Sequence, residues 1–201
     1  MLHSWSSLRG MREDVGMTIT LTRKQFTVDD YARMRETGIL TEDDRVELLD
    51  GEIYVMSPIG PLHVGLVNKL MKLLEKQVGD RAIISVQNPI RLDMHGEPQP
   101  DIAVLNPRDD FYTQALATPD DIFLLIEVSD TTLEYDREQK LPRYAKAHIS
   151  EVWIVDVGAQ VIEQYSQPLQ GVYTQLHKVL FGKRITAHTI QGIDFTTDRL
   201  F

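Results

Sequence analysis

One carboxylate stands where carboxylates rarely occur. Glu127 interrupts the run at residues 122–128 (IFLLIEV), in which every other side chain is hydrophobic. A continuous apolar run of this kind predicts a strand in the middle of a sheet, buried on both faces. Burying a carboxylate costs free energy unless a partner pairs with it or a metal ion binds it. Glu127 is therefore the first candidate for chemistry in this chain.

Asp101 offers a second carboxylate at a compatible position. If residues 101–105 and 122–128 form antiparallel strands, pairing Leu105 with Phe123 places Asp101 opposite Glu127 on the same face of the sheet. Neighbouring carboxylates repel each other, so one takes up a proton or a cation lies between them. Mg²⁺ is bound by one or two carboxylates together with waters and phosphate oxygens. A purely structural role for Glu127, paired with an arginine or capping a backbone group, stays open.

Lys140 is the third candidate, in the segment DTTLEYDREQK (residues 130–140) that follows the glutamate strand. A helix that leaves the strand end directly can return Lys140 to the carboxylates. There a lysine can orient an attacking water or offset charge on a phosphate; the alternative is a solvated helix lysine. Pro142 is tolerated only in a first turn or at a kink. The regular helix is therefore predicted to begin near Leu141, with Lys140 at its entrance.

Periodicity and turn residues predict the elements that position these groups. Thr27 and Asp30 have the spacing of a capping box, which starts a helix that runs to about Glu36. Asp50-Gly51 between two strand-like runs predicts a tight hairpin, and the apolar spacing over 61–78 predicts an amphipathic helix. Further predicted elements are strands at 82–86, 89–92, 101–105, 122–128 and 151–156, a helix over 136–147, a hairpin of 161–165 and 172–179 that turns across 168–171, and a segment 185–201 packed on a sheet edge.

The order of these elements predicts an α/β fold with a mixed sheet. The first three strands of the sheet have short or loop connections, which suit an antiparallel meander. The strands at 122–128 and 151–156 are joined through a helix, which lets them lie parallel in a right-handed crossover. We expect residues 1–20 to be a loose N-terminal extension and residues 21–201 to form a single domain.

Composition sets the class of protein. The chain has 201 residues, 42% of them hydrophobic and 25% charged, and it contains no cysteine. It has no apolar stretch long enough for a bilayer and no signal-peptide core, which favours a bacterial-type cytoplasm and no membrane partner. The net charge of −9 argues against a dedicated DNA-binding module, which normally carries a basic surface. An enzyme that meets nucleic acid through a local basic patch or through metal ions remains compatible with that charge.

An ordered set of motifs resembles the Uma-two family of bacterial proteins, in the restriction-endonuclease-like PD-(D/E)XK superfamily. The resemblance covers about Phe26 to Phe201. Its motifs are Pro100-Asp101, Glu127-Val-Ser129, Lys140 within DREQKLPRYAKA, EVWIVD at 151–156, RVELLDGE at 45–52, MSP at 56–58, and His63 at the start of the next helix. The resemblance implies a restriction-endonuclease-like core of helix, three-strand meander, helix and strand, with an N-terminal helix and hairpin and a C-terminal hairpin added.

The resemblance also implies roles for single residues. Asp101 and Glu127 would be ligands of Mg²⁺ or Mn²⁺, and the carbonyl of Val128 could add a third ligand. The lysine usually found two residues after the glutamate is replaced by Ser129, and Lys140 matches the lysine that takes its role in similar proteins. Glu47 resembles an extra acidic residue near the site, with a water-facing hairpin glutamate as the alternative. His63 is either a site residue or merely near the helix start.

Three functions follow from these observations. The first is a metal-dependent endonuclease that hydrolyses DNA phosphodiester bonds, with Lys140 and Glu47 as catalytic residues; a homodimer would suit the two cuts that duplex DNA requires. The second is a catalytically inactive nucleic-acid or protein-interaction domain that keeps the nuclease fold, favoured by the acidic charge and by Ser129. The third is a hydrolase with Ser129 as nucleophile, but no G-x-S-x-G motif surrounds Ser129.

Overall fold

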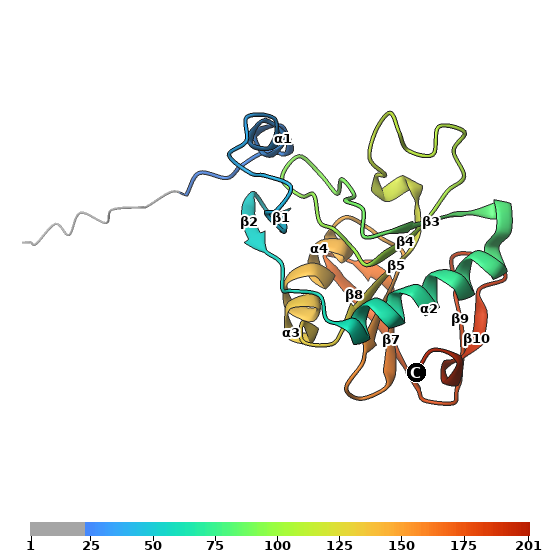
Figure 1. Ribbon diagram of the computed structural model, residues 1–201. Helices are drawn as coiled ribbons and strands as arrows, with labels where there is room; N and C mark the ends of the chain where they lie inside the picture. The colour runs from blue at the N-terminus through green and yellow to red at the C-terminus, as the bar shows by residue number, and fades with distance from the viewer. Residues whose placement is uncertain (1–22) are drawn as a thin grey trace, which may run out of the picture.

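A six-stranded mixed sheet organises the computed structural model, which describes residues 23–201. The strand order is β3-β4-β5-β6-β7-β8, and all neighbours are antiparallel except β5 and β6. The strands are β3 (Ile83–Val86), β4 (Ile102–Leu105), β5 (Ile122–Ser129), β6 (Glu151–Asp156), β7 (Val161–Leu169) and β8 (Val172–Leu180). The predicted mixed fold, with its meander and parallel crossover, is confirmed (Figure 1).

The pairing of β4 with β5 brings the two predicted carboxylates together. Ile102 pairs with Ile126 and Val104 with Leu124, and continuing this register by one residue sets Asp101 beside Glu127. The predicted pairing of Leu105 with Phe123 is wrong, because a bulge between Val104 and Leu105 shifts Leu105 to Ile122. A bulge inserts an unpaired residue into one strand, and this one lies at the far end of the pair from Asp101.

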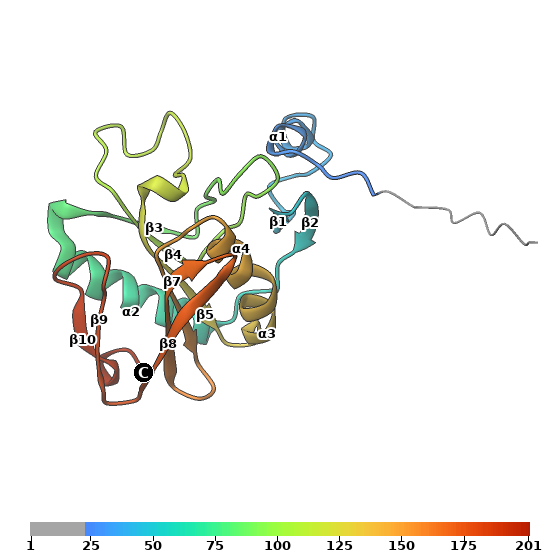
Figure 2. The same ribbon diagram turned by 180° about the vertical axis from the view of Figure 1, so that it is seen from behind.

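One face of the sheet is covered by α2 (Pro61–Val78) and by the C-terminal segment. Apolar side chains of α2 at three-and-four spacing, among them Leu70 and Leu74, pack against Ile126 and Trp153. The C-terminal segment lies beside α2 (Figures 1 and 2). It holds the short strands β9 (Arg184–Thr186) and β10 (Asp194–Thr196) and the 3₁₀ turn η4 (Thr197–Arg199). The predicted packing on a sheet edge is wrong, since Phe195 meets Trp153 edge-on in the core of this face, with ring centroids 6.1 Å apart.

The other face carries the helical segment that follows β5. This segment begins at α3 (Leu133–Tyr135), continues as a π-helical turn η3 (Asp136–Lys140) and ends as α4 (Leu141–Lys146). The predicted start at residue 136 is therefore three residues late, although the regular helix does begin at Leu141. Pro142 lacks an N–H and crowds the carbonyl four residues before it, and the wider π turn directly precedes it. Tyr144 of α4 packs with Leu125 and Val152 beneath this face.

The N-terminal elements stand above the strand ends. Thr27 and Asp30 form the predicted capping box of α1 (Val28–Glu36). The hairpin of β1 (Val46–Leu49) and β2 (Glu52–Val55) follows (Figure 1). Gly51 has φ +77°, and a Cβ there would lie 2.6 Å from Gln25 Cβ, so the turn requires glycine. A bridge between Leu48 and Glu97 joins the hairpin to the chain just before β4. The hairpin is thus fixed next to Asp101.

Two local predictions need correction. Residues 89–92 form no strand, because their N–H groups bond to turn and loop carbonyls: Ile90 to Pro98, Leu92 to Gly96. The β7–β8 turn is also tighter than predicted, since Pro168 still pairs with Tyr173. Pro168 lies beyond the last β6 partner of β7, Ser166, so its missing N–H removes no ladder bond on that side. The remaining short elements are 3₁₀ turns, η1 (Gly79–Arg81) and η2 (Pro119–Asp121).

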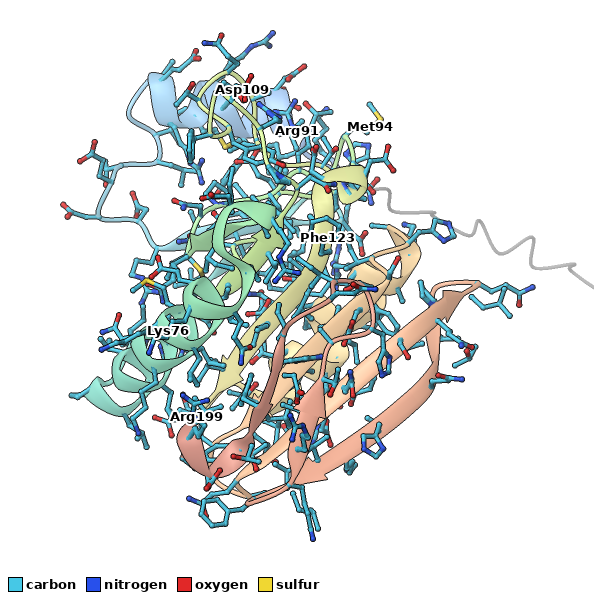
Figure 3. All side chains as sticks on the ribbon, turned by 90° about the vertical axis from the view of Figure 1, so that its right-hand side faces the viewer. Lys76, Arg91, Met94, Asp109, Phe123 and Arg199 are labelled. Atoms are coloured by element: carbon cyan, nitrogen blue, oxygen red, sulfur yellow. The ribbon has the colours of Figure 1, made fainter. Side chains whose placement is uncertain are left out.

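The predicted loose extension, residues 1–20, lies outside the described residues. Within residues 23–201, no helix combines the length and the hydrophobicity needed to cross a membrane. Side chains of the described residues surround the sheet on both faces (Figure 3).

Candidate active site

Glu127 lies near the end of β5 with only 2% of its surface exposed. Its carboxylate accepts hydrogen bonds from Lys140 Nζ, 3.2 Å from both oxygens, and from Tyr144 Oη, 2.6 Å from Oε1. The backbone N–H of Asp101 points to Oε2 at 3.4 Å. Burial raises the pKa of Glu127 well above its usual range, and the charge of Lys140 is the largest influence that opposes this rise. The predicted buried carboxylate is confirmed, together with the lysine beside it.

Asp101 precedes β4 and lies next to Glu127. Its Oδ2 accepts hydrogen bonds from the Val128 N–H at 2.8 Å and from His63 Nε2 at 3.0 Å, while Oδ1 lies 3.3 Å from Gln87 Nε2. Burial works to raise the pKa of Asp101, but the bond from His63 and the other donors outweigh it and lower the pKa. The same hydrogen bond raises the pKa of His63, so His63 stays protonated to higher pH. His63, left undecided from sequence, therefore lies in the cluster.

Lys140 enters the cluster from the π turn. Its ammonium donates to the carbonyl of Gln99 at 3.0 Å and to Glu127, and it lies 3.5 Å from Glu47 Oε2. Burial alone would lower the pKa of Lys140, but the carboxylates of Glu127 and Glu47 raise it above the usual range. The ammonium therefore stays charged. The alternative of a solvent-exposed helix lysine is excluded, since Lys140 is 5% exposed.

Glu47 reaches the cluster from β1, which the hairpin sets beside the start of β4. Its Oε1 accepts from Tyr135 Oη at 2.7 Å, and its Oε2 accepts from the Gln99 N–H at 2.9 Å. Glu47 is 1% exposed, so a hairpin glutamate facing water is excluded. Val128, the other predicted ligand, directly follows Glu127, and its N–H donates to Asp101 Oδ2. The role of the Val128 carbonyl stays a prediction.

Three residues that sequence reasoning missed complete the cluster. Tyr144 and Asp136 lie four residues after and four before Lys140, a spacing that puts side chains on one face of a helix and could have revealed them. Asp136 is 4% exposed, and its Oδ2 accepts hydrogen bonds from Ser129 Oγ and Thr132 Oγ1, each at 2.7 Å. Tyr135 is the third, and nothing in the sequence points to it except its position next to Asp136. Ser129 is thus a hydrogen-bond donor within the cluster.

The cluster opens onto a cavity of about 690 Å³. Its lining residues come from the β1–β2 hairpin, from the β2–α2 connection and the first turn of α2, from the segments after β3 and before β4, and from β5 with the helical segment that follows it. Its charged and histidine lining side chains are Arg45, Glu47, His63, Asp101, Glu127, Asp130, Glu134, Asp136 and Lys140. A small substrate group could therefore reach the carboxylates from solvent.

Comparison with known proteins agrees with this architecture. The family model Uma2, described as "Putative restriction endonuclease", matches residues 28–198. The chain belongs to the Uma2 family. A crystal structure of a putative nuclease of DUF820 from Anabaena variabilis has the same fold as this Uma2 protein, with a TM-score of 0.63 at 15% sequence identity. The match covers 88% of this chain and 97% of that chain. None of the curated proteins matches the sequence.

The charge balance of the Uma2 site suits a divalent cation. The carboxylates of Glu47, Asp101, Glu127 and Asp136 surround Lys140 and His63. With all four carboxylates ionised and His63 protonated, the cluster would carry two more negative than positive charges, and burial together with this mutual repulsion raises the pKa of Glu127 and of Asp136. Within residues 23–201 no group of three or more His, Cys, Asp and Glu side chains has metal-holding geometry. Two adjacent carboxylates that open onto a cavity still match Mg²⁺, which keeps several waters and takes few protein ligands.

Proposed function

We propose that this protein is a metal-dependent endonuclease that hydrolyses DNA phosphodiester bonds. Family membership supports nuclease activity of the restriction-endonuclease type. The observation that carries the finer proposal is the juxtaposition of Asp101 and Glu127 at adjoining strand ends, with Lys140 Nζ 3.2 Å from Glu127. An acidic pair with a buried lysine, open to a cavity, has the groups that phosphoryl hydrolysis requires.

Asp101, Glu127 and the carbonyl of Val128 would hold the ion, Mg²⁺ or Mn²⁺. When bound, such an ion supplies Lewis-acid polarisation of a phosphate oxygen and a lower pKa for water. Asp101 and Glu127 each accept hydrogen bonds from a cationic side chain, His63 and Lys140 respectively. Those donors hold the two carboxylates in place at the site where they would bind the ion.

Lys140 would stabilise the charge that develops on the phosphate. Its raised pKa suits this role, because a permanently protonated ammonium donates hydrogen bonds and cannot take a proton from water. Glu47 would act as a supporting group: it lies 3.5 Å from Lys140 and shares Gln99 with it as a backbone partner. Both residues therefore keep the catalytic assignment proposed from sequence, with Glu47 acting through Lys140.

A second candidate function is a nucleic-acid or protein-interaction domain that keeps the nuclease fold without cleavage. The net charge of −9 and the serine at position 129 favour it. It predicts that no divalent cation supports cleavage of any nucleic acid, although binding survives.

A cleavage assay separates the two candidates. Supercoiled plasmid and single-stranded DNA are incubated with the wild type in Mg²⁺, in Mn²⁺ and in EDTA. Glu127→Ala is the test variant, and Glu75→Ala, at an exposed position on α2, is the matched control. The endonuclease proposal expects cleavage by the wild type and by the control that requires metal and disappears in Glu127→Ala. Metal-dependent cleavage that persists in Glu127→Ala would refute the site assignment.

A further inference from the structure

Asp136 differs from Glu47, Asp101 and Glu127 in having one oxygen that accepts no hydrogen bond from the described residues, and it differs from Asp130 and Glu134, the other carboxylates of the cavity wall, in being buried. Its Oδ2 accepts two hydroxyl hydrogen bonds, from Ser129 and Thr132 at 2.7 Å each, whereas its Oδ1 accepts none from residues 23–201. The buried side-chain atoms without a partner in that part of the chain are His63 Nδ1 and Arg143 Nε. Asp136 Oδ1 is not among them, so this oxygen has access to the cavity that Asp136 lines.

The oxygens of the neighbouring glutamates are already occupied. Glu127 accepts from Lys140 on both oxygens, and Tyr144 and the Asp101 N–H add further bonds. Glu47 accepts from Tyr135 on Oε1 and from the Gln99 N–H on Oε2. Every oxygen of these two glutamates therefore already accepts at least one hydrogen bond.

Asp101 and Lys140 are committed as well. Asp101 Oδ2 holds His63 and the Val128 N–H, and Oδ1 faces Gln87 Nε2. Lys140, a protonated ammonium, donates to Gln99 and Glu127. Among Glu47, Asp101, Glu127 and Asp136, the oxygen that accepts no hydrogen bond from the described residues is thus Oδ1 of Asp136, which makes it the oxygen most open to the proton of an attacking water.

We propose that Asp136 is the general base of the site: its Oδ1 accepts the proton of the water that attacks the phosphate. This inference rests on the proposed nuclease function. The water O–H bond breaks and its proton forms a carboxylic acid on Asp136. The hydroxide oxygen bonds to phosphorus, the P–O bond to the leaving group breaks, and the leaving oxygen takes a proton from solvent. Asp136 then returns its proton to solvent.

Ser129 gains a function in this arrangement. It occupies the position two residues after Glu127, and its hydroxyl, with that of Thr132, binds Oδ2 of Asp136. Two donors on one oxygen fix the rotation of the carboxylate and leave Oδ1 as its free acceptor. Ser129 and Thr132 are therefore positioning residues for Asp136.

The electrostatic surroundings are consistent with a base. Burial raises the pKa of Asp136 above its usual range, and the charge of Lys140 limits the rise. A carboxylate with a raised pKa accepts a proton more readily than one with an ordinary pKa, and base catalysis is most effective when the pKa lies nearer the working pH.

The test uses Asp136→Asn, which preserves an acceptor for Ser129 and Thr132 and presents an amide NH₂ where Oδ1 was. We expect kcat for Mn²⁺-supported plasmid nicking to fall roughly 10²–10⁴-fold, the contribution typical of a general base. KM for DNA, and the Kd for Mn²⁺ measured by calorimetry, should stay within about threefold of wild type. Glu138→Gln, at an exposed acidic position on the same segment that does not line the cavity, is the matched control and should leave kcat unchanged.

Each outcome has a separate meaning. A kcat within threefold of wild type would overturn the assignment of Asp136, and so would a loss of Mn²⁺ affinity as large as the loss of kcat, since Asp136 would then be a ligand. If Asp136→Asn does not fold, Ser129→Ala decides: a kcat loss with unchanged KM and Mn²⁺ affinity supports the inference, and an unchanged kcat overturns it. A wild type that cleaves nothing would overturn the proposed function, and this inference with it.

Discussion

Replacing Lys140 with methionine should show how much the Lys140 ammonium contributes to the free energy of unfolding through the buried charge cluster. Methionine has similar length and no charge, so the change removes the ammonium and leaves the packing nearly intact. Lys140 is 5% exposed, lies 3.2 Å from both oxygens of Glu127, and donates to Gln99 at 3.0 Å. Removing one partner of such a buried ion pair costs about 3–5 kcal/mol of unfolding free energy.

An independent estimate follows from the protonation of Glu127. We take Glu127 to be ionised in the wild type beside the Lys140 ammonium, the charge that most opposes the rise that burial causes in its pKa; without Lys140, burial would keep the Glu127 carboxyl protonated in the folded state. Holding a glutamate of ordinary pKa, about 4.3, protonated at pH 7 costs about 3.7 kcal/mol, and at pH 5 about 1 kcal/mol. The folded variant then binds a proton that the unfolded chain has lost, so its stability falls as pH rises above the unfolded pKa. The deficit relative to wild type should therefore grow from pH 5 to pH 7.

Urea denaturation measures this deficit. Trp153 is fully buried, so its fluorescence reports unfolding. Lys76→Met, at an exposed position on α2 (Figure 3), is the control and should change stability by no more than about 0.5 kcal/mol. A Lys140→Met deficit below about 1 kcal/mol at pH 7, or an equal deficit at both pH values, would refute the reasoning, because Lys140 would then not be the counter-charge of an ionised Glu127.

Three further predictions concern stability. Tyr144→Phe removes the 2.6 Å hydrogen bond to Glu127 Oε1. It should lower the unfolding free energy measured in urea by about 1.5–3 kcal/mol, the range for hydrogen bonds to charged groups, and a loss under about 0.5 kcal/mol would contradict this. Burial raises the pKa of Glu163, but hydrogen bonds from Arg137 and Lys178 outweigh it and lower the pKa. The Tm advantage of wild type over Glu163→Gln should thus be full above the unfolded pKa of about 4.3 and shrink toward pH 3, whereas a constant gap would argue against the ion pairs. Gly51→Ala would place an alanine at φ +77° with its Cβ 2.6 Å from Gln25, so it should destabilise the protein by about 1–3 kcal/mol. Gly65→Ala is the control: no atom lies within 4 Å of the added Cβ, so it should stabilise helix α2 by up to about 1 kcal/mol. The opposite order of stability in thermal melts would refute the hairpin geometry.

The sequence predicts those elements whose signals are local. The capping box at Thr27, the Asp50-Gly51 turn and the apolar spacing of α2 each act within a few residues, and the structure confirms all three. Asp101 and Glu127 could also be brought together from sequence, because the alternation of strands limits the choice of register. The bulge after Val104 escaped prediction, since it depends on how the following loop leaves the sheet.

The surroundings of the site depend on contacts between distant segments. Glu47 is buried because Gln99 and Tyr135, remote in sequence, donate to it. The π turn that delivers Lys140 departs from regular helical periodicity, and its junction with α4 accommodates Pro142. In the sequence Asp136 resembles an ordinary helix carboxylate, and only the structure shows that Ser129 Oγ donates a hydrogen bond to it. Sequence therefore identified the charged residues that the sheet brings together, and missed the tyrosines and the aspartate that complete their shell.

Calorimetric titration with Mn²⁺ asks directly whether the carboxylates around Glu127 bind a divalent cation. We expect a divalent ion to bind the wild type at the Asp101–Glu127 pair. Binding should be lost in Glu127→Gln and retained in Glu75→Gln, an exposed control on α2. A wild type that binds no Mn²⁺, or a Glu127→Gln variant that binds it as well as wild type, would contradict a metal site at this carboxylate pair.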